Sequence, residues 1–353
     1  MSERLADVLE GYLDLRWRIN PVEGTYVGRT EFDTELPRFD PASTREYVAA
    51  LRAYTSSLEE VEAATLDEEI DRTAALHAAR HDLLTLEREK PHARNPAHAL
   101  FHALNAVHLL VARETGDAAH RSGALLARVQ ALPRFLDEAA AALTEPRSVF
   151  FDTARAMIKG GVSLIGDIVK RIHPSVADSA TVAEARDNAI AEMHRYADAL
   201  AGMEQGADET AGIGRDLFDL KLHTAHMIRE NADELLRFGE RLRTEAIAGL
   251  ERVGAELRPG TPWRDIVRGL RQDTPTRDSA IAEYAAAMHA ARAFTLERAL
   301  VSVPAGELVV APTPDFLRAL IPFAAYQGPA AFDGDGRGTF FVTLPQRDEP
   351  WRL

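Results

Sequence analysis

The sequence predicts a mainly α-helical protein that ends in a small β-sheet. Two observations carry this prediction. From Arg4 to about Ala299 the apolar residues recur at helical spacing, with frequent Ala, Leu, Glu and Arg between turn signals. After Leu300 the pattern becomes short, β-branched and aromatic, which is typical of strands. We therefore expect a long array of about ten helices followed by an incomplete antiparallel or mixed β-sheet at the C-terminus.

The expected helices are bounded by Pro, by Gly, or by Asp, Asn, Ser or Thr caps. The first ends at Asn20-Pro21, and the Gly- and Pro-containing stretch from there to Pro41 reads as irregular. Ser43 or Thr44 is expected to open the next helix, and Asn231 is expected to cap a helix whose first turn carries two carboxylates. Besides the helix opened by Ser43 or Thr44, the expected helices span residues 2–19, 67–89, 95–113, 117–143, 147–172, 178–203, 214–230, 231–257 and, from Thr274-Pro275, to near residue 300.

Three short stretches have a strand pattern: residues 301–304, 307–310 and 338–343. The run Gly334-x-Gly336-x-Gly338 reads as a hairpin turn, because a dinucleotide-binding loop opens a helix and this run opens a strand. We divide the chain into a helical domain, residues 1–300, and a partial strand-rich segment, residues 301–353. A sheet of two or three strands is only marginally stable unless further strands or helices pack on it. The alternative to an incomplete sheet is that its strands pack on the preceding helices.

Composition narrows the functional classes. The net charge is −14, from 55 acidic and 41 basic residues, so the protein repels phosphate backbones and anionic lipids. We expect neither nucleic acid nor a membrane as a partner. The absence of cysteine excludes disulfides and thiol nucleophiles. The N-terminus lacks the basic and apolar stretches of a secretory signal, and no window approaches the ~20 apolar residues of a membrane span, so we expect a cytoplasmic location.

Histidine is the natural metal ligand in a chain without cysteine. The pairs His77/His81 and His98/His102 have the i, i+4 spacing that places two imidazoles on one helix face. A zinc peptidase needs a glutamate after the first histidine, but alanine follows in both pairs and no His-Glu dipeptide occurs. We therefore expect no metal site formed by this chain alone. A helical metalloprotein that uses these four histidines stays open as an alternative.

The segment from Thr313 to Thr343 combines a strand with exposed-looking aromatic residues. An exposed strand edge can bind an extended peptide through main-chain hydrogen bonds, and aromatic side chains can shape pockets beside it. The alternative is that the aromatic residues belong to the core. The candidate substrate-binding residues are Tyr326, Phe332, Gly338, Thr339, Phe340 and Phe341.

Several motifs resemble the bacterial domain of unknown function 885 family, and together they span nearly the whole chain. In the C-terminal region they are Thr313-Pro314-Asp315-Phe316-Leu317-Arg318, Pro322-Phe323-Ala324-Ala325-Tyr326, Gly328-Pro329, Phe332-Asp333 and Gly338-Thr339-Phe340-Phe341-Val342. In the N-terminal half they are Asn20-Pro21, Thr25-Tyr26-Val27-Gly28, Asp33, Leu36-Pro37, Asp71-Arg72, Arg94-Asn95-Pro96 and Leu132-Pro133.

The resemblance implies a zinc-dependent, gluzincin-type peptidase whose long helical N-terminal part arches over a catalytic region. The family's metal helix, with a His-Glu pair followed by Pro-Gly-His, matches no residue here. The chain is therefore expected to be the substrate-binding portion of a metallopeptidase-like protein, without a cofactor of its own and completed by a second polypeptide that supplies the zinc helix. Tyr326 would donate a hydrogen bond near the reacting carbonyl of a peptide or small-molecule substrate, and Gly338 to Thr343 would align its backbone. A non-catalytic binding protein or degenerate enzyme is the alternative.

Overall fold

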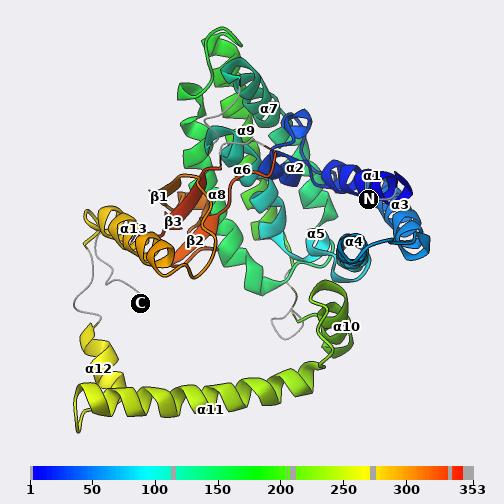
Figure 1. The fold of residues 1–353 in the computed structure, drawn as a ribbon. Helices are drawn as coiled ribbons and strands as arrows, with labels where there is room; N and C mark the ends of the chain where they lie inside the picture. Colours follow the sequence, from blue (N-terminus) through cyan, green and yellow to red (C-terminus); the bar gives the residue numbers. More distant parts are fainter. Residues whose placement is uncertain are drawn as a thin grey trace. The chain divides into compact units, whose positions relative to one another are not determined.

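The computed structural model describes residues 3–112, 117–204, 206, 212–270, 276–332 and 336–344. They form a mainly helical protein with one small sheet, which confirms the predicted fold class (Figure 1). The helices are α1 (Glu3–Ile19), α2 (Pro21–Val27), α3 (Pro41–Glu60), α4 (Leu66–Leu84), α5 (Pro91–Arg94), α6 (Pro96–Ala112), α7 (Ala118–Ala142), α8 (Phe151–Gly166), α9 (Ser179–Gly202), α10 (Arg215–Ala225), α11 (Ala232–Leu257), α12 (Trp263–Leu270) and α13 (Ala280–Glu297). The strands are β1 (Leu308–Pro312), β2 (Ala324–Gln327) and β3 (Gly338–Val342).

The chain forms two compact units. Unit 1 contains residues 1–228 together with 314–320 and 330–335, and unit 2 contains residues 229–313, 321–329 and 336–353. The domain boundary expected at residue 300 stays a prediction. Within the described ranges, no helix combines the length and the apolar character that a bilayer span needs.

Unit 1 has two groups of packed helices. Helices α6, α7, α8 and α9 pack against one another (Figure 1), and α1 packs with α3 and α4. The second group encloses a cluster of fully or nearly fully buried side chains that includes Tyr12, Leu51, Leu58 and Ala79. Burial of such apolar surface is the main favourable contribution to folding.

Helix starts in the N-terminal region differ from the prediction. The stretch from Asn20 to Pro41, expected to be irregular, contains α2, which has Pro21 at its first position and ends at Gly28 with a φ of 96°. Proline is common at the first position of a helix, and a glycine with left-handed backbone angles commonly ends one. Helix α3 starts before Ser43, because the Asp40 carboxylate caps it by accepting the backbone N–H groups of Ala42 and Ser43 at 3.1 and 3.0 Å.

The helices after residue 230 agree with the prediction in part. Asn231 caps α11 as expected, in a capping box with Glu234. The short helix α12 (Trp263–Leu270) was not expected. The expected start of the last helix at Thr274-Pro275 lies outside the described residues, and α13 begins at Ala280.

The sheet has the order β1-β3-β2 and is mixed. Strand β1 runs parallel to β3, and β2 runs antiparallel to it. The strand predicted at residues 301–304 is wrong, because that stretch is irregular, while residues 324–327 form β2, for which no strand was predicted. Part of the expected turn at Gly334-x-Gly336-x-Gly338, residues 333–335, lies outside the described residues.

A C-terminal segment completes the core of unit 1. The 3₁₀ turn η6 (Asp315–Leu317) packs on α8, where a Cβ atom added to Gly160 would lie 2.5 Å from the Phe316 nitrogen. Glycine at this position therefore allows two backbones to approach closely. The Phe316 ring is 1% exposed and contacts the His108 ring edge-to-face at 5.6 Å.

Candidate functional site

The sheet of unit 2 presents one edge strand with an aromatic side chain. Tyr326 on β2 is 60% exposed and pairs across the ladder with Phe340. Its ring also lies over Gly338, since a Cβ atom added there would lie 2.4 Å from the Tyr326 hydroxyl oxygen. Gly338 therefore gives the tyrosine ring the space to lie across β3.

The pairing register shows which main-chain groups of β2 face away from β3. The Thr343 N–H donates to the Phe323 carbonyl at 2.7 Å, so Phe323 and Thr343 form a hydrogen-bonded pair. In an antiparallel ladder such pairs alternate with non-bonded ones, and Ala324 and Tyr326 fall in non-bonded pairs. The N–H and C=O groups of Ala324 and Tyr326 therefore point outward from the sheet. Among the described residues, β2 has no strand on that outer side.

The strand expected to align a peptide backbone is not an edge. Strand β3 pairs with β1 on one side and with β2 on the other, so its main-chain groups are used within the sheet. The expectation that Gly338 to Thr343 offers an exposed edge is therefore wrong. The only edge next to Tyr326, within the described part of the sheet, belongs to β2.

The other candidate residues have different surroundings: some are buried or half-buried in the sheet of unit 2, and one belongs to unit 1. Phe341 is 7% exposed and belongs to the core of the sheet, and Thr339 and Phe340 are half-buried. The Phe340 ring stacks on the Tyr284 ring of α13 at 6.2 Å. Sequence reasoning missed Tyr284, because its helix is distant in the chain.

Phe332 belongs to unit 1 and is fixed there. Its backbone N–H donates to the Val27 carbonyl at 2.9 Å. Its ring contacts the Trp17 ring edge-to-face at 5.8 Å, and the Arg29 guanidinium lies 5.6 Å from its centre. These contacts anchor the loop that follows β2, so Phe332 has a structural role in unit 1.

The histidine pairs lie on separate helices and have different partners. His77 on α4 contacts the Thr224 carbonyl through Nδ1 at 3.0 Å, and the Nδ1 atom of His81 is buried without a hydrogen-bond partner. His98 and His102 on α6 lie side by side with ring centres 4.6 Å apart, next to the Phe39 ring. In the described part of the chain, no three His, Asp or Glu side chains are grouped so that they could hold a metal ion. The geometry gives no support to a four-histidine metal site.

Burial changes the protonation of the histidines around Phe39. Desolvation lowers the pKa of His102 to about 4 and holds the pKa of His98 well below 6.5, and the adjacent His102 and His92 lower the pKa of His98 further. These rings are therefore neutral at pH 7. They pack as polar aromatic groups against Phe39 and Phe101.

This arrangement predicts an acid-sensitive stability. The pKa of His102 is about 4 in the folded protein and near 6.5 when unfolded, so the unfolded state binds more protons between these values. Stability should therefore fall as the pH drops from about 6.5 toward 4, by on the order of 2 kcal/mol from this group. Denaturant unfolding across that range should show a shallower pH dependence for His102→Phe than for the wild type. Parallel curves for the two proteins would contradict the assignment.

A buried polar network ties the N-terminal loop to α6 and α7. Arg128 is 0% exposed and donates to the carbonyls of Ala106 (2.6 Å) and Phe32 (3.1 Å) and to the Thr25 hydroxyl (2.6 Å). The Thr25 hydroxyl in turn donates to the carboxylate of Asp33, which is also 0% exposed, at 2.8 Å. Thr25 and Asp33 lie in motifs that carried the family resemblance, and the structure gives them this architectural role.

The comparison with protein families identifies the chain. The model of a family described as a bacterial protein of unknown function, DUF885, matches residues 21–352. The chain belongs to the DUF885 family. This confirms the family part of the resemblance over almost the full sequence. No curated protein matches the DUF885 chain.

Solved structures share the fold of this DUF885 chain. It resembles a "putative lipoprotein of unknown function" from Shewanella oneidensis with a TM-score of 0.72 and 18% identity, covering 98% of this chain and 65% of that one. It also resembles a "putative lipoprotein" from Colwellia psychrerythraea with a TM-score of 0.69 and 9% identity, covering 98% of this chain and 68% of that one. At these identities the likeness shows the fold alone. The DUF885 chain thus spans about two thirds of the length of each.

Proposed function

We propose that this chain is the peptide-binding portion of a metallopeptidase-like protein, with the zinc ligands supplied by polypeptide outside these 353 residues. The edge of β2 carries the proposal. It presents outward main-chain groups at Ala324 and Tyr326 beside an exposed tyrosine ring, which is the arrangement that binds an extended peptide by strand addition. The motifs from Thr313 to Val342 that resemble the segment before a metal motif support it further.

The described residues do not themselves fit a zinc ion, which needs three protein ligands around one point. The role of this chain in the proposal is therefore to bind and orient substrate. The outward N–H and C=O groups of β2 would pair with a peptide main chain. Tyr326 is 60% exposed, and its hydroxyl, which lies next to Gly338 on the face of the sheet, would donate a hydrogen bond to a substrate carbonyl there.

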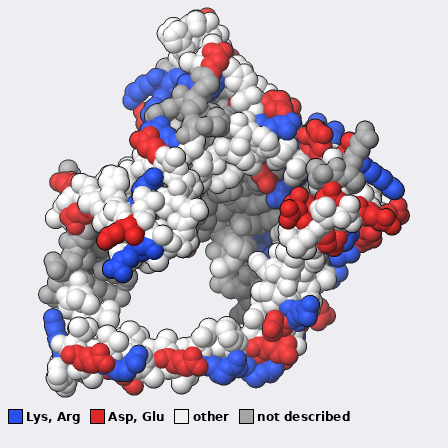
Figure 2. Space-filling model, viewed as in Figure 1, with Lys and Arg blue, Asp and Glu red and all other residues white. Residues whose placement is uncertain are grey.

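Helix α11 offers a surface for the remaining polypeptide. Phe238, Leu242, Leu250, Val253 and Leu257 are between 42% and 66% exposed and recur on one face of this helix. Acidic and basic side chains lie along α11 as well (Figure 2). An exposed apolar stripe of this length marks an interaction surface. Because about a third of the length of each similar structure lies outside the part that this chain covers, we propose that the zinc-bearing part packs on this stripe.

The first test addresses the β2 edge. Ala324→Pro removes the outward N–H but leaves the ladder intact, because Ala324 makes no hydrogen bond to β3. The affinity for fluorescently labelled extended hexapeptides, measured by fluorescence anisotropy, should fall roughly tenfold in this variant. A tenfold loss corresponds to about one hydrogen bond. Ala324→Val is the matched control, since it changes the side chain but keeps the N–H, and it should bind like the wild type. Equal affinity of the proline variant would refute strand addition at this edge.

The second test addresses the polypeptide partner. The chain is co-expressed with a polypeptide that carries a His-Glu motif from the same source, and the complex is assayed for zinc content and peptide hydrolysis. Leu242→Arg should abolish the complex by placing a charge in the apolar stripe of α11, whereas Thr244→Arg on the opposite face should leave it intact. Peptide binding without zinc or hydrolysis in the intact complex would favour a non-catalytic binding protein.

The cytoplasmic expectation stays a prediction, and the similar structures are described as lipoproteins. Fractionation of cells that express the native gene, followed by immunoblotting, will decide the compartment.

A further inference from the structure

The β2 edge offers a peptide only a short stretch of main chain. Its outward N–H and C=O groups belong to Ala324 and Tyr326. On one side the next outward position is Pro322, which has no N–H to donate. On the other side β2 ends at Gln327 and is followed by Gly328-Pro329. A peptide that pairs with this edge therefore finds one donor and one acceptor at each of two residues.

These main-chain groups set the length of peptide that the edge can recognise. In an antiparallel ladder, one peptide residue exchanges both of its hydrogen bonds with Tyr326, and the residue two positions further along exchanges both with Ala324. The peptide residue between them turns its own N–H and C=O groups away from β2. Main-chain recognition therefore extends over three consecutive residues, which occupy two outer positions and one middle position.

The two outer peptide side chains would lie on the face of the sheet that carries the Tyr326 ring. Side chains alternate between faces along a strand, and directly paired residues share a face. Tyr326 is paired with Phe340, so their rings lie on the same face as Ala324. Helix α13 covers part of this face, since the Tyr284 ring stacks on the Phe340 ring at 6.2 Å. The outer positions are therefore next to a surface of aromatic rings.

Tyr326 and Ala324 offer different surfaces to the two outer side chains. Tyr326 is 60% exposed, and its ring lies over Gly338 beside the half-buried Phe340. A peptide side chain opposite Tyr326 can pack on this ring, and cross-strand pairs that include an aromatic side chain stabilise a sheet. Ala324 is exposed and carries only a methyl group, which leaves space for a larger apolar side chain opposite it.

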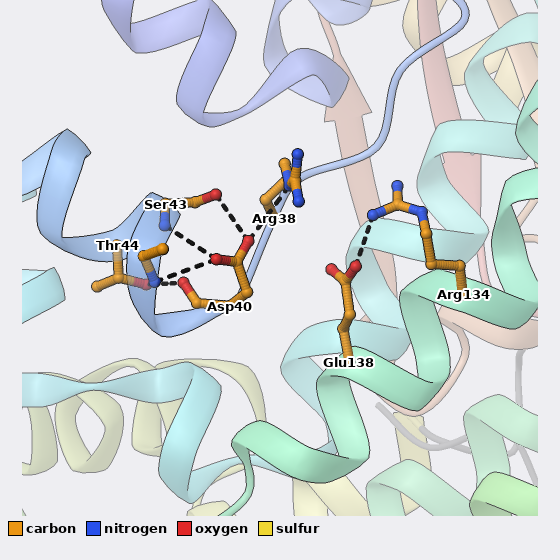
Figure 3. A network of polar contacts seen from close by, with 7 residues as sticks. Arg38, Asp40, Ser43, Thr44, Arg134 and Glu138 are labelled. Carbon is orange, nitrogen blue, oxygen red and sulfur yellow. Dashed lines mark hydrogen bonds and ion pairs between the residues drawn. The ribbon is translucent and has the colours of Figure 1, made fainter.

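The segment that carries the edge has no charged side chain. Residues 319–332 contain neither an acidic nor a basic residue. In the sheet itself, Arg337 pairs with Glu307 at 3.5 Å, beside β1 and β3. Unit 1, by contrast, has arginines that pair with carboxylates, as Figure 3 shows for Arg38 with Asp40 and Arg134 with Glu138. A charged group of a peptide at the β2 edge would lose hydration without gaining an ion pair from this segment.

We propose that the β2 edge binds three consecutive uncharged residues inside a peptide, with apolar side chains at the two outer positions. The inference rests on the proposed function, because it assumes strand addition at β2, and it adds which peptides bind. Tyr326 determines the preference at the outer position opposite it. The substrate class is an apolar internal stretch of polypeptide, and a charged chain end is disfavoured.

Length and charge are tested with peptides that displace a labelled hexapeptide from the full chain, measured by fluorescence anisotropy. The capped tripeptide acetyl-Phe-Thr-Leu-amide should bind within about threefold of a capped hexapeptide that adds flanking serines, because the flanking residues find no main-chain partner on β2. The same tripeptide with free, charged termini should bind roughly tenfold more weakly, and so should the capped tripeptide with Lys in place of Phe. Equal affinity of the capped, free and Lys-containing tripeptides would overturn the proposal.

Variants of Tyr326 assign the side-chain preference. The wild type should prefer Phe to Ser at the first position of the capped tripeptide roughly fivefold, about the value of a cross-strand aromatic pair. Tyr326→Phe keeps the ring and should keep this preference, whereas Tyr326→Ala should reduce it to less than about twofold and leave the affinity for the Ser peptide unchanged. Gln327→Ala changes a side chain on the opposite face and is the matched control. A full preference for Phe in Tyr326→Ala would contradict the role of Tyr326.

The Ala324→Pro variant separates this inference from the proposed function. If Ala324→Pro weakens binding while the wild type binds the Phe, Ser and Lys peptides alike, strand addition stands and the inferred substrate class is wrong. If Ala324→Pro binds every peptide as the wild type does, strand addition at β2 fails, and the inference fails with it.

Discussion

Replacing Arg128 with methionine is expected to destabilise the protein by about 3–5 kcal/mol, the cost of breaking a buried charged network. Arg128 is fully buried. Its guanidinium donates hydrogen bonds to the carbonyls of Ala106, Phe32 and Glu35 and to the Thr25 hydroxyl. Methionine fills similar space but donates no hydrogen bond. The acceptors would lose their donor, and the buried Asp33 would lose a nearby positive charge.

Chemical denaturation at pH 7 measures this loss as a shift in the free energy of unfolding. Arg134→Met is the matched control, because it removes an arginine from the same helix whose side chain is 52% exposed and which, among the described residues, forms an ion pair with Glu138 alone. Its expected cost is below about 1 kcal/mol. If Arg128→Met costs no more than Arg134→Met, the network is not what holds the N-terminal loop on α6 and α7.

Replacing Phe316 with alanine is expected to cost about 3–5 kcal/mol, the range for a buried aromatic ring. Phe316 is 1% exposed, and its ring contacts the His108 ring at 5.6 Å. The backbone of η6 lies so close to Gly160 on α8 that the segment cannot move inward to fill the cavity left by the ring. The loss should therefore fall at the upper part of the usual range for large-to-small substitutions.

The control for this variant is Leu320→Ala, which removes an apolar side chain that is 44% exposed from the same segment. It should change the free energy of unfolding by less than about 1 kcal/mol. Native-state proteolysis should also cleave Phe316→Ala, but not Leu320→Ala, within residues 314–320. Comparable stability of the two variants would mean that the C-terminal segment contributes little to the core of unit 1.

Local chemistry was sufficient to predict most helices and their caps. Apolar residues at a period of 3.6 mark the buried face of a helix wherever it packs, so α1, α4, α6, α7 and α9 lie close to their expected ranges. The capping box of Asn231 and Glu234 was readable because both partners are three residues apart. The irregular stretch before Pro41 was misread, since Gly24 was counted as a breaker within a seven-residue helix.

Strand β2 shows what local reading misses. Its sequence, Ala-Ala-Tyr-Gln, lacks β-branched residues, and it is a strand because β3 supplies its hydrogen-bond partners. Because β3 pairs with a strand on each side, it is the central strand of the sheet, and β2, which carries Tyr326, is an edge strand. Phe332 was grouped with Tyr326 by sequence proximity, but its partners Trp17 and Val27 belong to unit 1.

The sequence by itself determined the helical class, the small C-terminal sheet and the absence of cysteine chemistry, because each follows from residue types and short-range spacing. The DUF885 membership follows from the match of residues 21–352 to the family model. Only the tertiary structure decided which strand is the edge, why Arg128 is buried, and which side chains share a face of the sheet with Tyr326. Such facts depend on contacts between residues far apart in the chain. Their free energy comes from burial and from partners that no local pattern records.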